Sequence, residues 1–206
     1  FENVNNQIVE VENAFPKFTF QFTKAFENVL DGDFNYSKID FKTNYEFVHK
    51  NQSLTSFLLV AGLALGDVPL THLYHAYPNQ INKSTIAQRF TVAGINSFET
   101  MFFNEFFSDR FITLQTKHFL KPFQISQRFK PQFVLISRHA IGDMNNIDRH
   151  QGIEFGTLNK IFNESGFEIN KLIFGFGLSF AYRYGAYHLT EFEDNFSFKF
   201  TFNLSL

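Results

Sequence analysis

The stretch NFSFKFTFNLSL, residues 195–206, decides the fold class of this chain. Large apolar side chains occupy every second position, and mostly polar side chains occupy the positions between them. A period of two is the signature of a β-strand with two different faces. Twelve residues at about 3.3 Å each and tilted near 45° span roughly 28 Å, close to the apolar thickness of a bilayer. The stretch therefore predicts a membrane-crossing strand. Its apolar face consists of Phe196, Phe198, Phe200, Phe202, Leu204 and Leu206.

A second stretch, residues 174–185, repeats the alternation with a different polar face. Aromatic or apolar residues, among them Phe174, Phe176 and Phe180, alternate there with small residues and with Arg183. Lipid offers no hydrogen-bond partner to a backbone, so spanning strands must close into a ring that leaves no edge. The two stretches together predict an all-β fold, an antiparallel transmembrane β-barrel.

About eight strands are expected along the chain. Residues 1–15 are expected to be a linker or the end of a preceding strand, and residues 16–206 a barrel segment, the C-terminal part of a larger barrel. A long outer loop is expected at 67–100, and a short inner connection at 162–165. The expected strands are 16–27, 33–49, 54–66, 101–119, 129–141, 152–161, 166–185 and 195–206. Gly62 and Gly66 predict close backbone approach in the third strand.

The composition supports a barrel and excludes several other classes. Phenylalanine makes up 32 of the 206 residues, more than one buried core would use. The longest uninterrupted apolar run, residues 57–65, is about half as long as a membrane helix, which excludes helical spans. The net charge of -2 gives no sign of a nucleic-acid partner. The absence of cysteine excludes disulfides and Cys-based zinc sites.

Six segments, among them FETMFFNEFFSDRFITLQTKHF (98–119) and FGLSFAYRYGAY (176–187), carry a resemblance to a known family. Together they resemble a family of uncharacterised outer-membrane barrels of Bacteroidetes-type bacteria, in which a carboxypeptidase-regulatory-like domain precedes the barrel. This chain is similar to the C-terminal barrel portion. The resemblance implies a barrel in the outer membrane of a Gram-negative cell envelope, and it implies no activity. The remaining segments are 16–41, 61–73, 164–173 and 194–206.

Four charged residues form the candidate polar network of the barrel lumen: Glu105, Asp109, Lys117 and Arg183. Strict alternation places Glu105 and Asp109 on one face, so that two carboxylates would share the lumen. One interpretation is an ion path through the barrel. The other, which we favour, is a salt-bridge ladder that braces the wall, because barrels commonly fill their lumens with such side chains.

No metal or other cofactor is expected. His72 and His75 have the spacing HxxH, but the sequence supplies no further ligand set for a metal. The stretch RHAIGDMNNIDRH, residues 138–150, offers two histidines and two aspartates without the regular acidic spacing of a calcium loop.

A hydrolytic enzyme is disfavoured by the sequence. Ser137 and His139 share one strand face and Ser179 is expected in the lumen, but several serines and seven histidines make such pairs common. The motif GxSxG is missing. Aromatic residues near the outer end of the final strands predict a girdle at the membrane boundary. They are Tyr182, Tyr184, Tyr187 and Phe192.

The favoured function is therefore a non-enzymatic outer-membrane barrel that belongs to an envelope assembly, export or uptake complex. Its expected partners are outer-membrane lipid, the barrel-assembly machinery that recognises a terminal strand like 195–206, and other envelope proteins. One alternative is a small barrel enzyme or pore that uses lumen carboxylates. Another is a soluble calyx that turns its phenylalanines inward around an apolar ligand.

Overall fold

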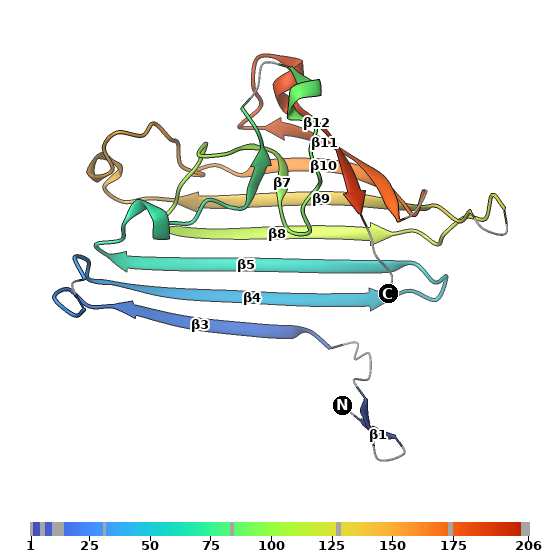
Figure 1. The fold of residues 1–206 in the computed structure, drawn as a ribbon, viewed down its shortest axis with the longest axis horizontal. Coiled ribbons are helices and arrows are strands. Elements are labelled where there is room, and N and C mark those ends of the chain that lie inside the picture. The colour runs from blue at the N-terminus through green and yellow to red at the C-terminus, as the bar shows by residue number, and fades with distance from the viewer. Residues whose placement is uncertain are drawn as a thin grey trace.

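The main body of the molecule is a single antiparallel sheet of eight strands, in the order β12-β11-β10-β9-β8-β5-β4-β3 (Figure 1). The computed structural model describes residues 2–4, 7–9, 15–30, 32–82, 85–126, 129–172 and 175–202. The predicted all-β, antiparallel class is confirmed. The strands are β3 (Lys17–Ala25), β4 (Tyr36–Val48), β5 (Leu54–Gly66), β8 (Arg110–Phe119), β9 (Gln132–Asp143), β10 (Phe162–Asn170), β11 (Phe176–Gly185) and β12 (Phe196–Phe202).

Smaller elements lie outside this sheet. Strands β1 (Glu2–Val4) and β2 (Gln7–Val9) pair with each other, and β6 (Pro78–Gln80) pairs with β7 (Phe98–Phe102) in parallel. The short 3-10 helices are η1 (Leu70–His72), η2 (Ile86–Arg89), η3 (Ile147–Arg149) and η4 (Phe192–Asn195). Within the described ranges, every helix is too short to cross a bilayer.

The sheet is open in the described part of the chain, with β3 and β12 as its edge strands. Residues 91–93 occupy part of the outer edge of β12, because Phe200 donates its N–H to Thr91 and accepts from the N–H of Ala93. Among the described residues, no strand pairs with the outer edge of β3. That edge presents a row of backbone groups that another strand can bind.

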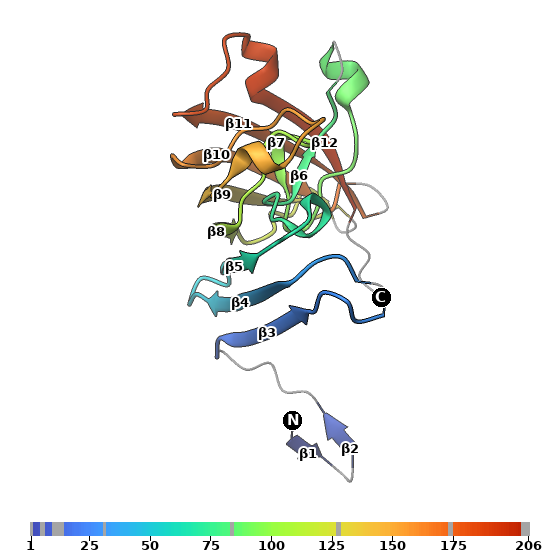
Figure 2. The ribbon, with the colours of Figure 1, turned by 90° about the vertical axis from the view of Figure 1, so that its left-hand side faces the viewer.

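Residues 67–109 pack against one face of the sheet, and we call this stretch, as far as it is described, the covering segment. Figure 2 shows β6 and β7 on one side of the sheet, which curves around them toward β12. The Tyr74 ring stacks on Phe111 with centroids 4.4 Å apart. A Cβ atom at Gly62 would lie 2.4 Å from the Tyr74 ring, so the predicted close approach occurs where the covering segment presses on β5.

The two faces of the sheet differ in polarity and in exposure. The face under the covering segment, which we call the inner face, buries an apolar core that includes Phe111 and Phe162, and beside it charged residues such as Arg138, Glu164 and Lys199. The opposite, outward face carries large exposed apolar side chains; Phe20 is 68% exposed and Phe200 is 41% exposed. In a water-soluble domain the side of a sheet that faces away from the core would be the polar one. Phe174, Leu204 and Leu206, which the sequence also assigns to the apolar face, lie outside the described residues.

The prediction of a strand over residues 152–161 is wrong. These residues form irregular structure that joins the covering segment: Gly156 donates its N–H to Glu105 and accepts from the N–H of Phe107. The predicted connection at 162–165 belongs to strand β10 instead. The apolar residues Ile153 and Phe155, which suggested a strand, pack against the buried core from its rim.

Two further predicted strands are divided in the structure. Residues 166–185 contain the end of β10 and all of β11, and positive φ angles of 59° at Lys171 and 81° at Gly175 accompany the reversal between them. Residues 101–119 contain the end of β7 and all of β8, with a positive φ of 61° at Asn104 between them. Apolar residues continue through both interruptions in the sequence, so the alternation of apolar and polar residues did not reveal where the strands are divided.

Candidate functional site

A row of charged side chains crosses the inner face directly beneath the covering segment. The strand register aligns Gln115, Arg138, Glu164 and Arg183 on four neighbouring strands, β8 to β11. The two arginines and the glutamate are at most 1% exposed. Burial of a charge is costly unless the charge is paired and hydrogen-bonded. The partners of this row therefore determine what the site can do.

Glu164 attaches the sheet to the covering segment. Its carboxylate accepts hydrogen bonds from the backbone N–H groups of Glu99 at 3.1 Å and Thr100 at 2.6 Å. It also accepts from the Thr100 hydroxyl at 2.6 Å, and it pairs with the Arg138 guanidinium at 2.5 Å. One buried carboxylate thus accepts hydrogen bonds from two backbone N–H groups of β7 and compensates the charge of Arg138 on β9.

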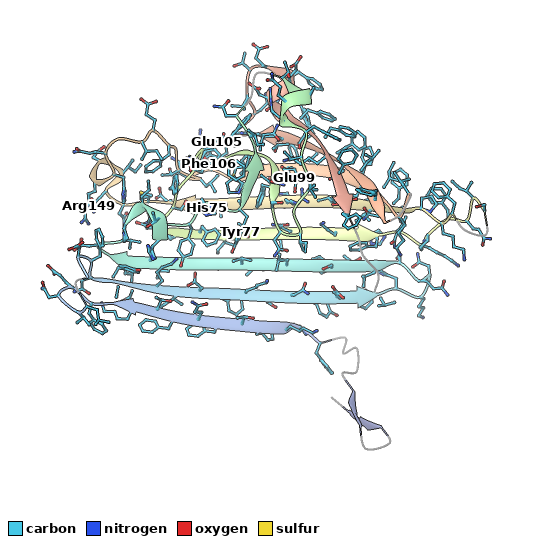
Figure 3. All side chains as sticks on the ribbon, viewed as in Figure 1. His75, Tyr77, Glu99, Glu105, Phe106 and Arg149 are labelled. Atoms are coloured by element: carbon cyan, nitrogen blue, oxygen red, sulfur yellow. The ribbon has the colours of Figure 1, made fainter. Side chains whose placement is uncertain are left out.

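Glu99, labelled in Figure 3, connects β7 to Asn79 and to Lys199 on β12. Its carboxylate accepts from the Ser97 hydroxyl at 2.6 Å and from the Asn79 amide at 2.7 Å, and it lies 3.5 Å from the Lys199 ammonium on β12. Lys199 also donates to the Asn79 carbonyl. Burial raises the pKa of Glu99, although Arg138 acts in the other direction.

Arg183 forms the second ion pair between the sheet and the covering segment. Its guanidinium lies 2.7 Å from the Glu105 carboxylate. The guanidinium also lies over the Phe162 ring, 4.8 Å from its centroid, and 5.8 Å from that of Phe106. Glu105 and Phe106 share the same part of the covering segment in Figure 3. Ionic and cation–π contacts together fix this end of the segment.

The other two residues of the predicted lumen network lie elsewhere. Asp109 pairs with its neighbour Arg110 at 3.0 Å and accepts the N–H of Asn145 at 2.7 Å. Lys117 pairs with Glu168 at 3.1 Å on the inner face. Of the four residues named from sequence, the structure brings only Glu105 and Arg183 into direct contact, and it divides the rest between two other ion pairs.

A cavity of about 610 Å³ opens on the inner face beside the Lys117–Glu168 pair. It lies at one end of β3, β4, β5 and β8, the end at which the connection 49–53 joins β4 to β5. Residues 93–96 of the covering segment form part of its wall. Its lining mixes both signs of charge: Lys17, Lys42, Glu46, Lys117 and Glu168. The covering segment thus packs on part of the inner face and leaves a polar vestibule beside it.

The two histidines of the HxxH spacing, His72 and His75, make separate ring contacts. His72 packs against Tyr36, with ring centroids 5.4 Å apart. His75 lies against Phe107 and Tyr77, and burial lowers the pKa of its imidazole (Figure 3). Across the described ranges, no three histidine or carboxylate side chains are grouped as metal ligands.

The loop after β9 is also held by contacts that are not metal sites. Asp143 pairs with Arg110 at 2.6 Å, and Arg149 pairs with Asp67 at 2.6 Å. Tyr187, which the sequence assigned to an outer girdle, instead packs on Phe106 and donates its hydroxyl to the Thr157 carbonyl. It therefore fastens the loop 144–161 to the covering segment.

Three comparisons were made, with protein-family models, with curated proteins and with solved structures. None finds a match.

Sequence reasoning did not single out Glu99, Arg138, Glu164 or Lys199. The signal for Lys199 was present, because it stands on the polar face of the strongly alternating strand that ends the chain. Arg138 likewise lies between Ser137 and His139, which face outward. Glu164 was missed because the sequence placed it in a connection, so its position opposite Arg138 could not be inferred.

Proposed function

We propose that this chain forms part of the wall of a β-barrel in the bacterial outer membrane. The outward face of the sheet contacts lipid, and the inner face surrounds the covering segment in the lumen. The single observation that carries this proposal is the outward face of the sheet, which exposes large apolar side chains while charged side chains are buried on the inner face. Exposed apolar patches of this extent are rare on soluble monomers, whereas a lipid-facing surface requires them.

The role proposed for the inner face and the open edge is that of a non-enzymatic component of an envelope assembly, export or uptake complex. Two features support it. The open edge of β3 offers its backbone to a further strand of a larger ring or to another envelope protein. The polar vestibule of about 610 Å³, which Thr201 and Phe202 of β12 help to line, provides a charged surface on the proposed periplasmic side.

The alternatives from the sequence are less well supported. A calyx would point its phenylalanines inward, but Phe176, Phe200 and Phe202 on the outward face are each more than 40% exposed. A simple pore needs an open lumen, whereas the covering segment is held on the inner face by the Glu164 and Arg183 contacts. The resemblance to the Bacteroidetes barrel family agrees with the proposal and adds no role.

Insertion into vesicles tests the proposal. The protein, extracted in mild detergent, is mixed with vesicles of phosphatidylethanolamine and phosphatidylglycerol, and the detergent is removed. We expect the protein to float with the vesicles and to resist extraction by alkaline carbonate. A protein that stays monodisperse in buffer without detergent or lipid would contradict the proposal.

A further inference from the structure

Three polar side chains form a hydrogen-bonded chain on the outward face of the sheet. Ser137 and His139 are two residues apart on β9, and Asn163 lies directly opposite His139 on β10. Ser137 Oγ is 2.9 Å from His139 Nε2, and His139 Nδ1 is 2.7 Å from Asn163 Oδ1. A serine, a histidine and a third group that orients the histidine are the parts of an acyl-transfer triad.

The hydrogen bonds of Asn163 determine which imidazole nitrogen carries the proton. Asn163 Nδ2 donates to the Ile161 carbonyl at 3.3 Å, which leaves Oδ1 to accept from the Nδ1–H of His139. Nε2 then has a lone pair and accepts from the Ser137 hydroxyl. A histidine in this tautomer can remove the serine proton as a general base.

Two further hydroxyl groups lie beside the serine. Ser165 is opposite Ser137 in the register of β9 and β10, and its Oγ is 3.0 Å from the Tyr184 hydroxyl. Whichever of the two donates to the other, the pair keeps a second proton that can be donated to a bound group. Hydroxyl donors next to a nucleophile can stabilise the oxyanion of a tetrahedral intermediate.

An apolar groove of about 480 Å³ adjoins these hydroxyls on the outward face. Ser165 and Tyr184 lie in its wall with the aromatic rings of Phe133, Phe167 and Phe180. Asn163 and Tyr184 are each one residue from the ends of β10 and β11 that meet the loops 144–161 and 186–191, whereas Phe133 lies near the opposite end of β9. The groove therefore extends from the Ser165 and Tyr184 hydroxyls, beside Ser137, along the sheet into the region proposed to contact lipid.

We infer that the outward face carries a lipid esterase site with Ser137 as nucleophile, His139 as general base and acid, and Asn163 as the residue that orients His139. The substrate class is a glycerophospholipid, because an ester at the end of the strands beside a groove for one acyl chain matches a lipid of the outer leaflet. The inference rests on the proposed function for the orientation of the sheet in the membrane. It adds an activity on the outward face to the non-enzymatic role proposed for the inner face.

The reaction balances with water as the only co-reactant. Ser137 Oγ attacks the acyl carbonyl carbon while its proton passes to His139 Nε2. The carbon–oxygen bond to glycerol then breaks, and the proton moves from Nε2 to the glycerol oxygen, which releases a lysophospholipid. Water attacks the acyl ester of Ser137, gives one proton to Nε2 and releases the fatty acid as Ser137 regains its proton.

A fluorophosphonate probe tests the nucleophile without any requirement for a membrane. The detergent-extracted protein is incubated with the probe and digested, and the modified peptide is identified by mass spectrometry. We expect a phosphonyl adduct on Ser137, formed with loss of fluoride. Folded wild-type protein with no adduct on Ser137 would overturn the inference, and this readout does not depend on a variant that might misfold.

Fatty-acid release from vesicles of phosphatidylethanolamine and phosphatidylglycerol tests the substrate class. We expect Ser137→Ala to lower the rate by at least about a thousandfold, as loss of a triad nucleophile does. The matched control is Ser179→Ala, which removes a hydroxyl from the inner face of β11 and should leave the rate unchanged. Equal rates for wild type and Ser137→Ala would also overturn the inference.

The two proposals fail in different ways in these experiments. Protein that inserts into vesicles but neither labels at Ser137 nor releases fatty acid would refute the esterase alone. Protein that labels at Ser137 but does not insert would refute the membrane wall, and with it the lipid substrate, while leaving the triad.

Discussion

Strand β10 presents two chemically opposite surfaces within nine residues. On its inner face it buries Glu164, which pairs with Arg138 on the neighbouring β9, and Glu168, which pairs with Lys117 two strands away on β8. Toward the outside it shows Asn163, Ser165 and Phe167, and the Phe167 ring stacks with its cross-strand neighbour Phe180 at 4.9 Å. The same strand therefore has a polar interior and a largely apolar exterior.

The difference shows how each face is stabilised. On the inner face, charges that lost their water are compensated by specific partners, so one missing partner leaves a buried charge. On the outward face, side chains interact with neighbours of the same kind and with whatever solvent covers them. A substitution on the inner face should therefore change the unfolding free energy by removing an ionic partner. A substitution on the outward face should change it according to whether lipid or water surrounds the side chain.

The largest effect is expected from Arg138→Ala on the inner face. The change leaves the Glu164 carboxylate buried without its 2.5 Å ionic partner, and loss of one member of a buried pair costs about 3–5 kcal/mol of unfolding free energy. Urea unfolding of the protein in vesicles measures it. A loss below about 1 kcal/mol, the value of an exposed pair, would show that the inner face is hydrated.

The next effect compares two positions on the outward face of β11. Phe180 is in the middle of the strand and Phe176 is its first residue. In a bilayer, arginine costs about 2–4 kcal/mol at the midplane and about 0–1 kcal/mol near the interface. We expect Phe180→Arg to lower the unfolding free energy in vesicles by more than Phe176→Arg. Equal losses at the two positions would argue against a membrane around this face.

A smaller contrast separates the two buried glutamates of the inner face. Glu164→Gln weakens hydrogen bonds to a charged acceptor, worth about 1.5–3 kcal/mol each. Glu99→Gln should cost less, because burial already raises the pKa of Glu99 toward the neutral form. Urea unfolding at pH 7 compares the two variants. A larger loss for Glu99→Gln would reverse the assigned roles.

The raised pKa of Glu99 also predicts the direction in which stability changes with pH. The folded state keeps this proton at pH values where the unfolded chain has released it, so the contribution of Glu99 to stability falls as pH rises above its ordinary pKa. Glu99→Gln should remove that part of the slope, which unfolding curves at several pH values would show.

The smallest effect is expected at the loop pair Arg149–Asp67. Both side chains are 55% exposed, and exposed ion pairs contribute about 0–1 kcal/mol. Arg149→Ala should therefore change the unfolding free energy by less than 1 kcal/mol. A loss as large as that of Arg138→Ala would mean that this loop is buried against a partner.

The sequence predicted the class of the fold because the alternation in residues 174–185 and 195–202 is a local property. It did not predict where β10 and β11 are divided, since apolar residues continue in the sequence between Lys171 and Gly175, the two positions with a positive φ. It paired Glu105 with the inner face but could not find Glu164, whose partners are set by the register of β9 and β10 and by the path of β7.

The triad on the outward face illustrates the same limit. The spacing of Ser137 and His139 is readable from the sequence, but it is common and was given little weight. Asn163, the residue that distinguishes this pair from others, is 24 positions away from His139 and becomes its neighbour only through strand pairing. The sequence therefore indicates Ser137 and His139 as a pair, but it does not show that strand pairing places Asn163 beside them.

One measurement tests most directly whether the outward face is in lipid and the inner face is not. The chain has no tryptophan, so Phe167→Trp on the outward face of β10 and Phe162→Trp on its inner face each introduce a single indole. Both variants are placed in vesicles of phospholipids brominated on their acyl chains, and fluorescence quenching is recorded. The account predicts strong quenching for Phe167→Trp and little for Phe162→Trp. Equal quenching of the two variants, or none at Phe167→Trp, would contradict it.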